Sequence, residues 1–190
     1  MTAAAPRAVV KEDDTAFRAM LVEIIPSLRA FARGMCGNRD TADDLAQEAV
    51  MRAWAARDSY AAGTNFRAWM FMILRNHYFS YLRKNSRVVS CEPELAERVL
   101  VSGPAQHDVI GLSDLGVALQ KLPSDQREAL MLVGAHGLSY QEAAEIIGCA
   151  IGTIKSRVAR GRAALTVLID GNEHSDSAES LVGHGARQGV

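Results

Sequence analysis

The chain has 190 residues, of which 48% are hydrophobic and 6% aromatic, and its 21 basic and 22 acidic side chains leave a net charge of −1. This length predicts one or two compact domains. The chain lacks a signal peptide and any apolar run long enough to cross a membrane, and its three cysteines lack zinc-ligand spacing. We therefore expect a soluble, cytoplasmic, all-α protein with no cofactor.

The distribution of charge is more informative than its total. Phe66–Val89 contains five basic residues and no acid, and Ala150–Leu168 repeats this bias. The acids gather in Glu12–Asp14, Asp40–Glu48 and Glu92–Glu97 and in the C-terminal tail. Such segregation indicates separate surfaces for different partners.

Two helices are predicted in the first forty residues after a mobile N-terminus. Apolar residues recur at helical spacing from Phe17 to Met35, so a helix should start at Asp13 or Asp14, and Pro26 should kink or split it. Asp40 should then cap a second helix. The side of this second helix that carries acids and Met51 has two readings, a solvated face or a partner-binding surface.

A loop, Arg57–Asn65, leads to a long predicted helix, Phe66–Lys84. Its expected inward stripe comprises Phe66, Trp69, Met70, Ile73, His77 and Tyr81. Basic residues interleaved with Tyr78, Phe79 and Tyr81 suit single-stranded nucleic acid, because cations neutralise phosphates and rings stack on bases. The alternative is that Trp69, Phe71 and Tyr78 are core residues.

Ser90–Gly111 contains two prolines and is net acidic, so it indicates a flexible linker between two small helical domains. In the second domain, Ser113 should cap a short helix and Ser124 should cap a helix over Asp125–Ala135. The predicted organisation is a disordered N-terminus (1–12), a first domain (13–89), a linker (90–111), a second domain (112–168) and a disordered tail (169–190).

Ser139–Arg162 predicts two short helices joined by a tight turn. Ser139 and Glu142 fit a capping box, and Gly148 suits the left-handed end of the first helix. The second helix, from about Ile151, is basic and free of acids. Either this is a helix-turn-helix whose second helix enters a DNA major groove, or it is a helical hairpin with a solvated basic face.

Three motifs in order resemble one family, the extracytoplasmic-function (ECF) sigma factors of bacterial RNA polymerase. Asp43–Trp54 resembles the family's core-polymerase-binding helix, Asn65–Lys84 its −10 and promoter-melting helix, and Leu122–Leu165 its −35-reading domain. The amino-acid sequences of the second and third motifs are similar to those of the general stress response (EcfG-type) subgroup.

The resemblance implies roles for individual residues. The helix that faces core polymerase should present Asp43, Asp44, Gln47, Glu48, Met51 and Arg52. The residues that take a flipped −10 base and hold the melted strand should be Ser59, Tyr60, Asn65, Phe66, Arg75, Asn76, Arg83 and Lys84. The −35 element should be contacted by Thr153, Lys155, Ser156, Arg157, Ala159, Arg160 and Arg162, although Ala159 is smaller than the residue many members carry there.

The resemblance also implies partners: core RNA polymerase, promoter DNA, a NepR-type anti-sigma factor and a PhyR-type response regulator that releases it. The chain contains no phosphate-binding loop, metal cluster or catalytic triad pattern, so it is not expected to be an enzyme. Two alternatives remain open: a sigma-like mimic that sequesters an anti-sigma factor without touching DNA, and a stand-alone helix-turn-helix repressor.

Overall fold

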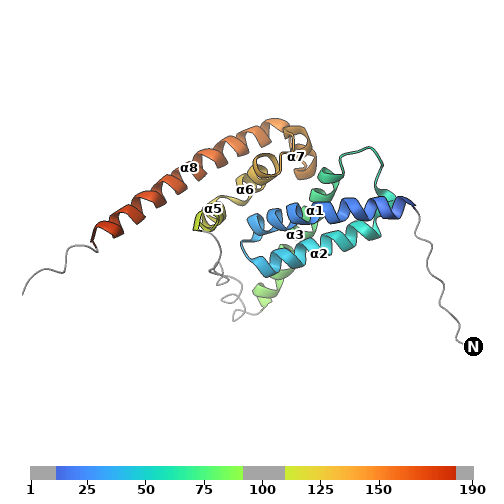
Figure 1. Ribbon diagram of the computed structural model, residues 1–190, viewed down its shortest axis with the longest axis horizontal. Coiled ribbons are helices and arrows are strands. Elements are labelled where there is room, and N and C mark those ends of the chain that lie inside the picture. The colour runs from blue at the N-terminus through green and yellow to red at the C-terminus, as the bar shows by residue number, and fades with distance from the viewer. Residues whose placement is uncertain (1–11, 92–109, 183–190) are drawn as a thin grey trace, which may run out of the picture.

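The computed structural model describes residues 12–91 and 110–182, and all the regular structure in these ranges is helical, as predicted (Figure 1). The elements are α1 (Glu12–Cys36), α2 (Arg39–Ala55), a short 3-10 helix η1 (Arg57–Ser59), α3 (Phe66–Cys91), α5 (Ile110–Lys121), α6 (Ser124–Leu130), a π-helix η2 (Met131–Ala135), α7 (Tyr140–Ile147) and α8 (Ile151–Val182). The expectations for the N-terminal eleven residues, for the linker from 92 to 109 and for residues 183–190 lie outside the described residues.

Helices α1, α2 and α3 pack against one another as the first domain. α1 buries Phe17, Leu21, Leu28, Phe31 and Met35 on one side, at helical spacing. Of the two predicted effects of Pro26, a kink or a split, the split is wrong, since α1 continues through the proline without a break. Because the apolar residues on both sides of the proline share one buried stripe, packing favours a continuous helix over the local loss of one hydrogen bond.

The start of α2 differs from the prediction. Asn38, in an extended conformation, is the capping residue, and its Oδ1 accepts from the Thr41 backbone N–H at 2.9 Å. Asp40 instead lies in the first turn, where a carboxylate favours the positive end of the helix dipole. The apolar side of α2, which includes Ala46 and Ala49, is buried against α1 and α3.

The inward stripe of α3 is also rotated from its predicted position. Met70, Phe71, Leu74 and Tyr78 are the buried residues, whereas five of the six predicted residues (Phe66, Trp69, Ile73, His77 and Tyr81) are only half-buried. The reason is that α3 is covered from two sides, by the first domain and by the second. Phe71 and Tyr78 are thus core residues, and the Tyr78 hydroxyl donates to the Met35 carbonyl at 3.2 Å, which removes it as a base-stacking residue here.

The second domain departs from the prediction at both ends of α6. Its capping position is Pro123, without a side-chain hydrogen bond, so Ser124 is the first helical residue and not the cap. The single helix predicted over Asp125–Ala135 ends as α6 at Leu130 and continues as the π-helix η2. π-Helices arise as single-turn irregularities that are frequent at functional sites.

The local signals of the helix-turn-helix are confirmed. Ser139 and Glu142 form a reciprocal capping box at the start of α7, and Gly148 ends α7 in the left-handed conformation, with φ +77°. α8 begins at Ile151 as expected but runs to Val182, where a disordered tail from residue 169 was predicted. A helix already nucleated by packed turns extends more easily than a new one starts, which explains the longer element.

The two domains pack together. α6 and η2 lie against α1, α7 lies against α3, and α8 lies on the side away from the first domain (Figure 1). Buried residues of both domains form one hydrophobic cluster. A side chain at Gly34 of α1 would place its Cβ 2.3 Å from the Met131 Cε of η2, so a larger residue there would require the methionine side chain to move. The linker predicted between the domains therefore does not keep them apart.

Candidate nucleic-acid interface

The outward face of α8 carries most of the predicted −35 set. Ile154 and Val158 are buried, which orients the helix and leaves Lys155, Arg160 and Arg162 exposed. Ser156 and Ala159 are also exposed, and Thr153 is half-buried. Among the described residues, no carboxylate lies within ion-pair distance of Lys155, Arg160 or Arg162, so this face is a cationic surface open to a ligand.

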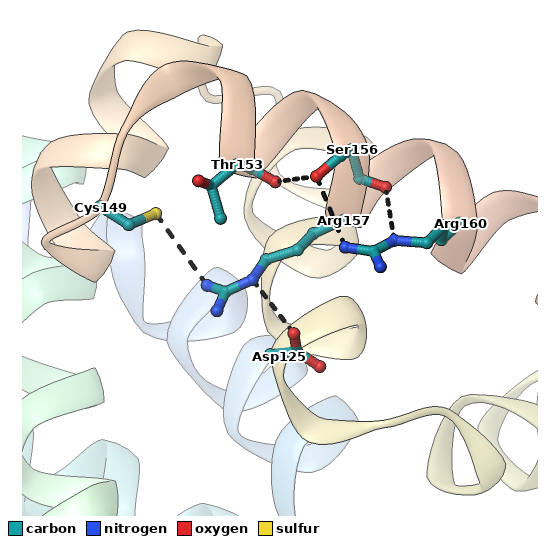
Figure 2. A network of polar contacts seen from close by, with 6 residues as sticks. All are labelled: Asp125, Cys149, Thr153, Ser156, Arg157 and Arg160. Carbon is teal, nitrogen blue, oxygen red and sulfur yellow. Dashed lines mark hydrogen bonds and ion pairs between the residues drawn. The ribbon is translucent and has the colours of Figure 1, made fainter.

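Hydrogen bonds along α8 order this face. The Ser156 hydroxyl donates to the Thr153 carbonyl at 2.9 Å, and Arg160 Nε donates to the Ser156 carbonyl at 3.3 Å (Figure 2). The guanidinium of Arg160 is thus held close to the helix surface, which lowers the entropy lost when it engages a base edge or a phosphate.

Arg157 points the other way. Its Nε lies 3.1 Å from Asp125 Oδ2 on α6, its Nη1 lies 4.0 Å from the Cys149 sulfur, and its side chain is 22% exposed (Figure 2). This arginine joins α8 to the helix behind it. Although predicted with the DNA-contacting set, it is paired within its own domain in this structure.

The first half of the predicted −10 set surrounds the start of α3. The Ser59 hydroxyl donates to the Ala56 carbonyl at 2.6 Å, and the Tyr60 hydroxyl to the Thr64 carbonyl at 2.8 Å. The rings of Tyr60 and Phe66 have centroids 5.3 Å apart and join two other half-buried rings, Trp54 and Trp69, in a cluster around the buried Phe17. Rings at this depth give a firm support beside which an unpaired base can stack.

Asn65 links the two domains while it caps a helix. Its Oδ1 accepts from the Ala68 backbone N–H at 3.1 Å, which caps α3. Its Nδ2 donates to Oε1 of Glu142 on α7, in the other domain. The second oxygen of Glu142 accepts from the Ser139 backbone N–H and hydroxyl, each at 2.8 Å, and these bonds lower the pKa of this carboxyl.

Arg75 forms the most buried ion pair of the described residues. Its Nε lies 2.5 Å from Glu128 Oε1, and the two side chains are 20% and 3% exposed. Its guanidinium also lies over the ring of Phe79 at 4.8 Å. Burial raises the pKa of Glu128, an effect that the positive charge of Arg75 opposes. A residue predicted to hold the promoter backbone is therefore occupied by an acid of the second domain.

The remaining −10 residues lie farther along α3, on its exposed side. The Ser80 hydroxyl donates to the backbone carbonyl of Asn76 at 2.8 Å, and Arg83 Nη2 donates to the same hydroxyl at 2.9 Å. Lys84 is exposed as well. The predicted −10 set is thus divided: Asn65 and Arg75 contact the second domain, whereas Asn76, Arg83 and Lys84 face outward.

The predicted polymerase-binding residues share the outer side of α2. Arg29 of α1 binds Asp43 with two hydrogen bonds of 2.6 Å, which lower the pKa of Asp43, and Glu48 pairs with Arg52 at 2.8 Å. Met51 is 59% exposed. A hollow of about 370 Å³ on this side is lined by Thr41, Asp44, Leu45, Gln47, Glu48, Met51, His77 and Tyr81.

Sequence reasoning missed four contributors to these surfaces. His77 and Tyr81 extend the hollow beside α2 onto α3. The helical periodicity of the sequence had assigned both residues to the inward stripe of α3. Glu128, and the second role of Glu142, could not be inferred, because their partners lie 53 and 77 positions away in sequence. The acid-free basic run around Arg75 was the one available signal, since a buried cation needs a carboxylate from elsewhere.

Two negative findings apply to the described ranges, 12–91 and 110–182. No three His, Cys, Asp or Glu side chains there are grouped to hold a metal ion. No helix there has both the length and the apolar content of a membrane span.

Comparisons with known proteins agree with this division. Residues 21–88 match the family Sigma-70 region 2, and residues 112–165 match Sigma-70, region 4. The ECF RNA polymerase sigma factor EcfG of Rhodopseudomonas palustris (strain TIE-1) is 47% identical over 86% of this chain and 93% of its own length.

Two solved structures are similar as well. The sigma factor RpoE of Bartonella quintana, in complex with the anti-sigma factor NepR, is 44% identical, with 82% of this chain and 98% of that chain covered and a TM-score of 0.72. A chain of the PhyRSL–NepR complex from Sphingomonas sp. Fr1 shares the fold at 19% identity, with 78% and 85% covered and a TM-score of 0.56.

Proposed function

Because this chain belongs to the ECF sigma factors of bacterial RNA polymerase, we propose that it directs the polymerase to the promoters of general stress response genes. The observation that carries the proposal is the 47% identity with an EcfG sigma factor over nearly all of that protein's length. Sigma factors bind and do not catalyse, so the energy for promoter melting comes from contacts.

We assign the −35 element to the outer face of α8. Lys155 and Arg160 are exposed and unpaired with acids of the described chain, and a hydrogen bond to the Ser156 carbonyl orders Arg160. Such cations suit contacts with guanine edges and phosphates. The −10 element is assigned to the aromatic cluster at the start of α3, with Asn76, Arg83 and Lys84 along the single strand.

The outer side of α2 is the proposed site for core polymerase. It combines Asp44 and Glu48 with the exposed, adaptable side chain of Met51 around one hollow. Charge complementarity predicts a basic partner surface there.

Regulation is proposed by analogy with a relative. Since a 44% identical sigma factor forms a complex with NepR, we infer that a NepR-type anti-sigma factor holds this chain inactive and that a PhyR-type response regulator releases it.

The test is transcription in vitro with purified core polymerase on a general stress promoter. Addition of the chain should start transcription, and a NepR-type protein should stop it. Replacing both Lys155 and Arg160 by alanine should abolish initiation, whereas Lys121→Ala, which removes an exposed cation of the same domain, should not. Absence of stimulated initiation would contradict the proposal.

The second candidate is a sigma-like mimic that binds an anti-sigma factor and no DNA. The fold shared with a chain of the PhyRSL–NepR complex favours it only at the level of architecture. The open cationic face of α8 argues against it, because a mimic has no need of such a face. Binding to a NepR-type protein without any stimulated initiation in the transcription assay would make the mimic the better candidate.

A further inference from the structure

Arg57, the first residue of η1, joins this short helix to two other elements of the first domain. Its Nε donates to Asp14 Oδ1 at the start of α1 at 3.2 Å, and its Nη1 donates to the Trp54 carbonyl at 3.1 Å. Its guanidinium also lies over the Trp54 ring, 4.9 Å from the ring centroid. One side chain thus connects η1 both to α1 and to the last turn of α2.

The loop that follows η1, residues 60–65, is folded by hydrogen bonds within itself. The Tyr60 hydroxyl donates to the Thr64 carbonyl at 2.8 Å, and the Thr64 hydroxyl donates to the Ala61 carbonyl at 2.7 Å. The Tyr60 ring, with its centroid 6.1 Å from that of Phe17, links the start of the loop to α1. Because η1 buries none of its own residues, the polar link described above is a second anchor at this end of the loop.

The contacts of Arg57 contribute position more than stability. The side chains of Arg57 and Asp14 are 34% and 26% exposed, and ion pairs this close to solvent typically add little to the free energy of unfolding. A guanidinium is planar and rigid, however, so it can hold two hydrogen bonds and a ring contact in one fixed geometry. A binding site made by a loop depends on such support, because its backbone must stay close to the productive position.

We propose that Arg57 is a positioning residue for −10 recognition: through Asp14 and Trp54 it sets the place of the loop that takes the flipped base. The inference rests on the proposed −10 role of that loop. Arg57 acts through the loop and not on the base, because its guanidinium is engaged on α1 and α2. Loss of the link leaves the loop folded but free to move, so a correct and a wrong base are distinguished less well, whereas −35 binding by α8 is unaffected.

The test measures base discrimination by the holoenzyme assembled from the full chain and core polymerase. A forked DNA carries the −10 sequence of a promoter that the holoenzyme opens, and each base of that sequence is replaced in turn. The readout is the ratio of the affinity for the original DNA to the affinity for the replaced DNA, at the position where the unaltered protein shows the largest ratio. A variant that merely folds less well lowers both affinities by the same factor and leaves this ratio unchanged.

Arg57→Leu removes the charge, both hydrogen bonds and the guanidinium contact with the ring. A wrong base in a recognition site typically costs about 5-fold to about 150-fold in affinity, and we expect this variant to reduce the ratio by about fivefold. Asp14→Asn should also reduce the ratio, and the double variant should show no loss beyond that of Arg57→Leu, because both residues belong to one link. Arg57→Lys should recover only part of the ratio, since an ammonium group does not reproduce the planar geometry.

Arg18→Ala is the matched control. Arg18 of α1 also lies over the Trp54 ring, 4.8 Å from its centroid, but among the described residues it makes no hydrogen bond to η1 or to the loop. The ratio should therefore stay unchanged in this variant. An unchanged ratio in Arg57→Leu, or an equal loss in Arg18→Ala, would overturn the inference.

The proposed −10 role of the loop is checked in the same assay with residues assigned directly to the −10 element. Asn65→Ala and Phe66→Ala should each reduce the ratio. If neither did, the −10 assignment would fail and the inference with it. A reduced ratio in these two variants together with an unchanged ratio in Arg57→Leu would overturn the inference alone.

Discussion

The two basic surfaces of this sigma factor differ in what their cations meet. On α8, Lys155 and Arg160 face outward, and Asp125 of α6 is paired with the inward-pointing Arg157. On α3, Arg75 is paired with Glu128 of the other domain. The difference shows that a run of basic residues in sequence does not establish an available surface, because availability depends on where the remaining acids lie in the fold.

The largest effect should come from the open surface. Replacing Lys155 and Arg160 together by alanine removes two contacts worth about 1–3 kcal/mol each when they are made with base edges. Initiation from a −35-dependent promoter should fall by roughly 30-fold or more, measured by transcription in vitro with a fixed amount of core polymerase. An equal loss on a promoter that lacks its −35 element would show that the two residues act elsewhere.

The closed interface should be acid-sensitive at His136. Burial, followed by the charge of Arg67, lowers the pKa of this histidine from 6.5 to about 4. The unfolded chain therefore binds a proton between these pH values while the folded chain does not. Stability is fully present above pH 6.5 and is lost as the pH falls towards 4, by up to about 3 kcal/mol.

Chemical denaturation between pH 4 and pH 7 measures this loss. His136→Phe keeps an aromatic ring beside Phe31 and Phe71 but cannot titrate, so its stability should change less with pH than that of the unaltered chain. Identical pH profiles for the two proteins would show that His136 does not contribute to acid sensitivity.

A smaller effect is expected at the capping box of α7. Ser139→Ala removes the hydroxyl that accepts from the Glu142 backbone N–H at 3.2 Å, and loss of such a cap costs about 1 kcal/mol. A lower melting temperature, measured by circular dichroism, is the expected result. Ser156→Ala, which removes a hydroxyl from the exposed face of α8, is the control and should melt as the unaltered chain does.

The smallest effect separates the two arginines of α8. Arg157→Ala should lower the free energy of unfolding by about 0.5–1 kcal/mol, the modest value of a partly exposed pair, whereas Arg160→Ala should leave it unchanged. In transcription assays the order should reverse, with Arg160→Ala the more damaging. Equal stability of the two variants would mean that the Asp125 pair contributes nothing to the fold.

Elements whose signals are local could be predicted from the sequence. The capping box at Ser139 and the left-handed Gly148 are determined by side chains within ten residues of each other, and the buried pattern of α8 follows from Ile154 and Val158 at helical spacing. For the same reason the positions of the three motifs along the chain were sufficient to identify the family.

Features set by distant contacts could not be predicted. The buried side of α3 depends on Phe71 meeting His136, and the partner of Arg75 comes from a helix 53 positions later. Local periodicity holds no information on such pairs, so the stripe of α3 was placed on the wrong side. The cap of α2 was missed for a different reason: three polar residues near its start all suit a cap, and only the backbone shows that Asn38 is the extended one.

The bond between Asn65 and Glu142 has a consequence for how the domains separate. Each side chain uses one polar atom for its own helix and another for the partner domain: Oδ1 of Asn65 caps α3, and Oε2 of Glu142 completes the start of α7. Separation therefore breaks the bond between the domains without uncapping either helix. The two domains can come apart as intact units, whereas a substitution of either residue would weaken both the contact between the domains and the helix start that the residue caps.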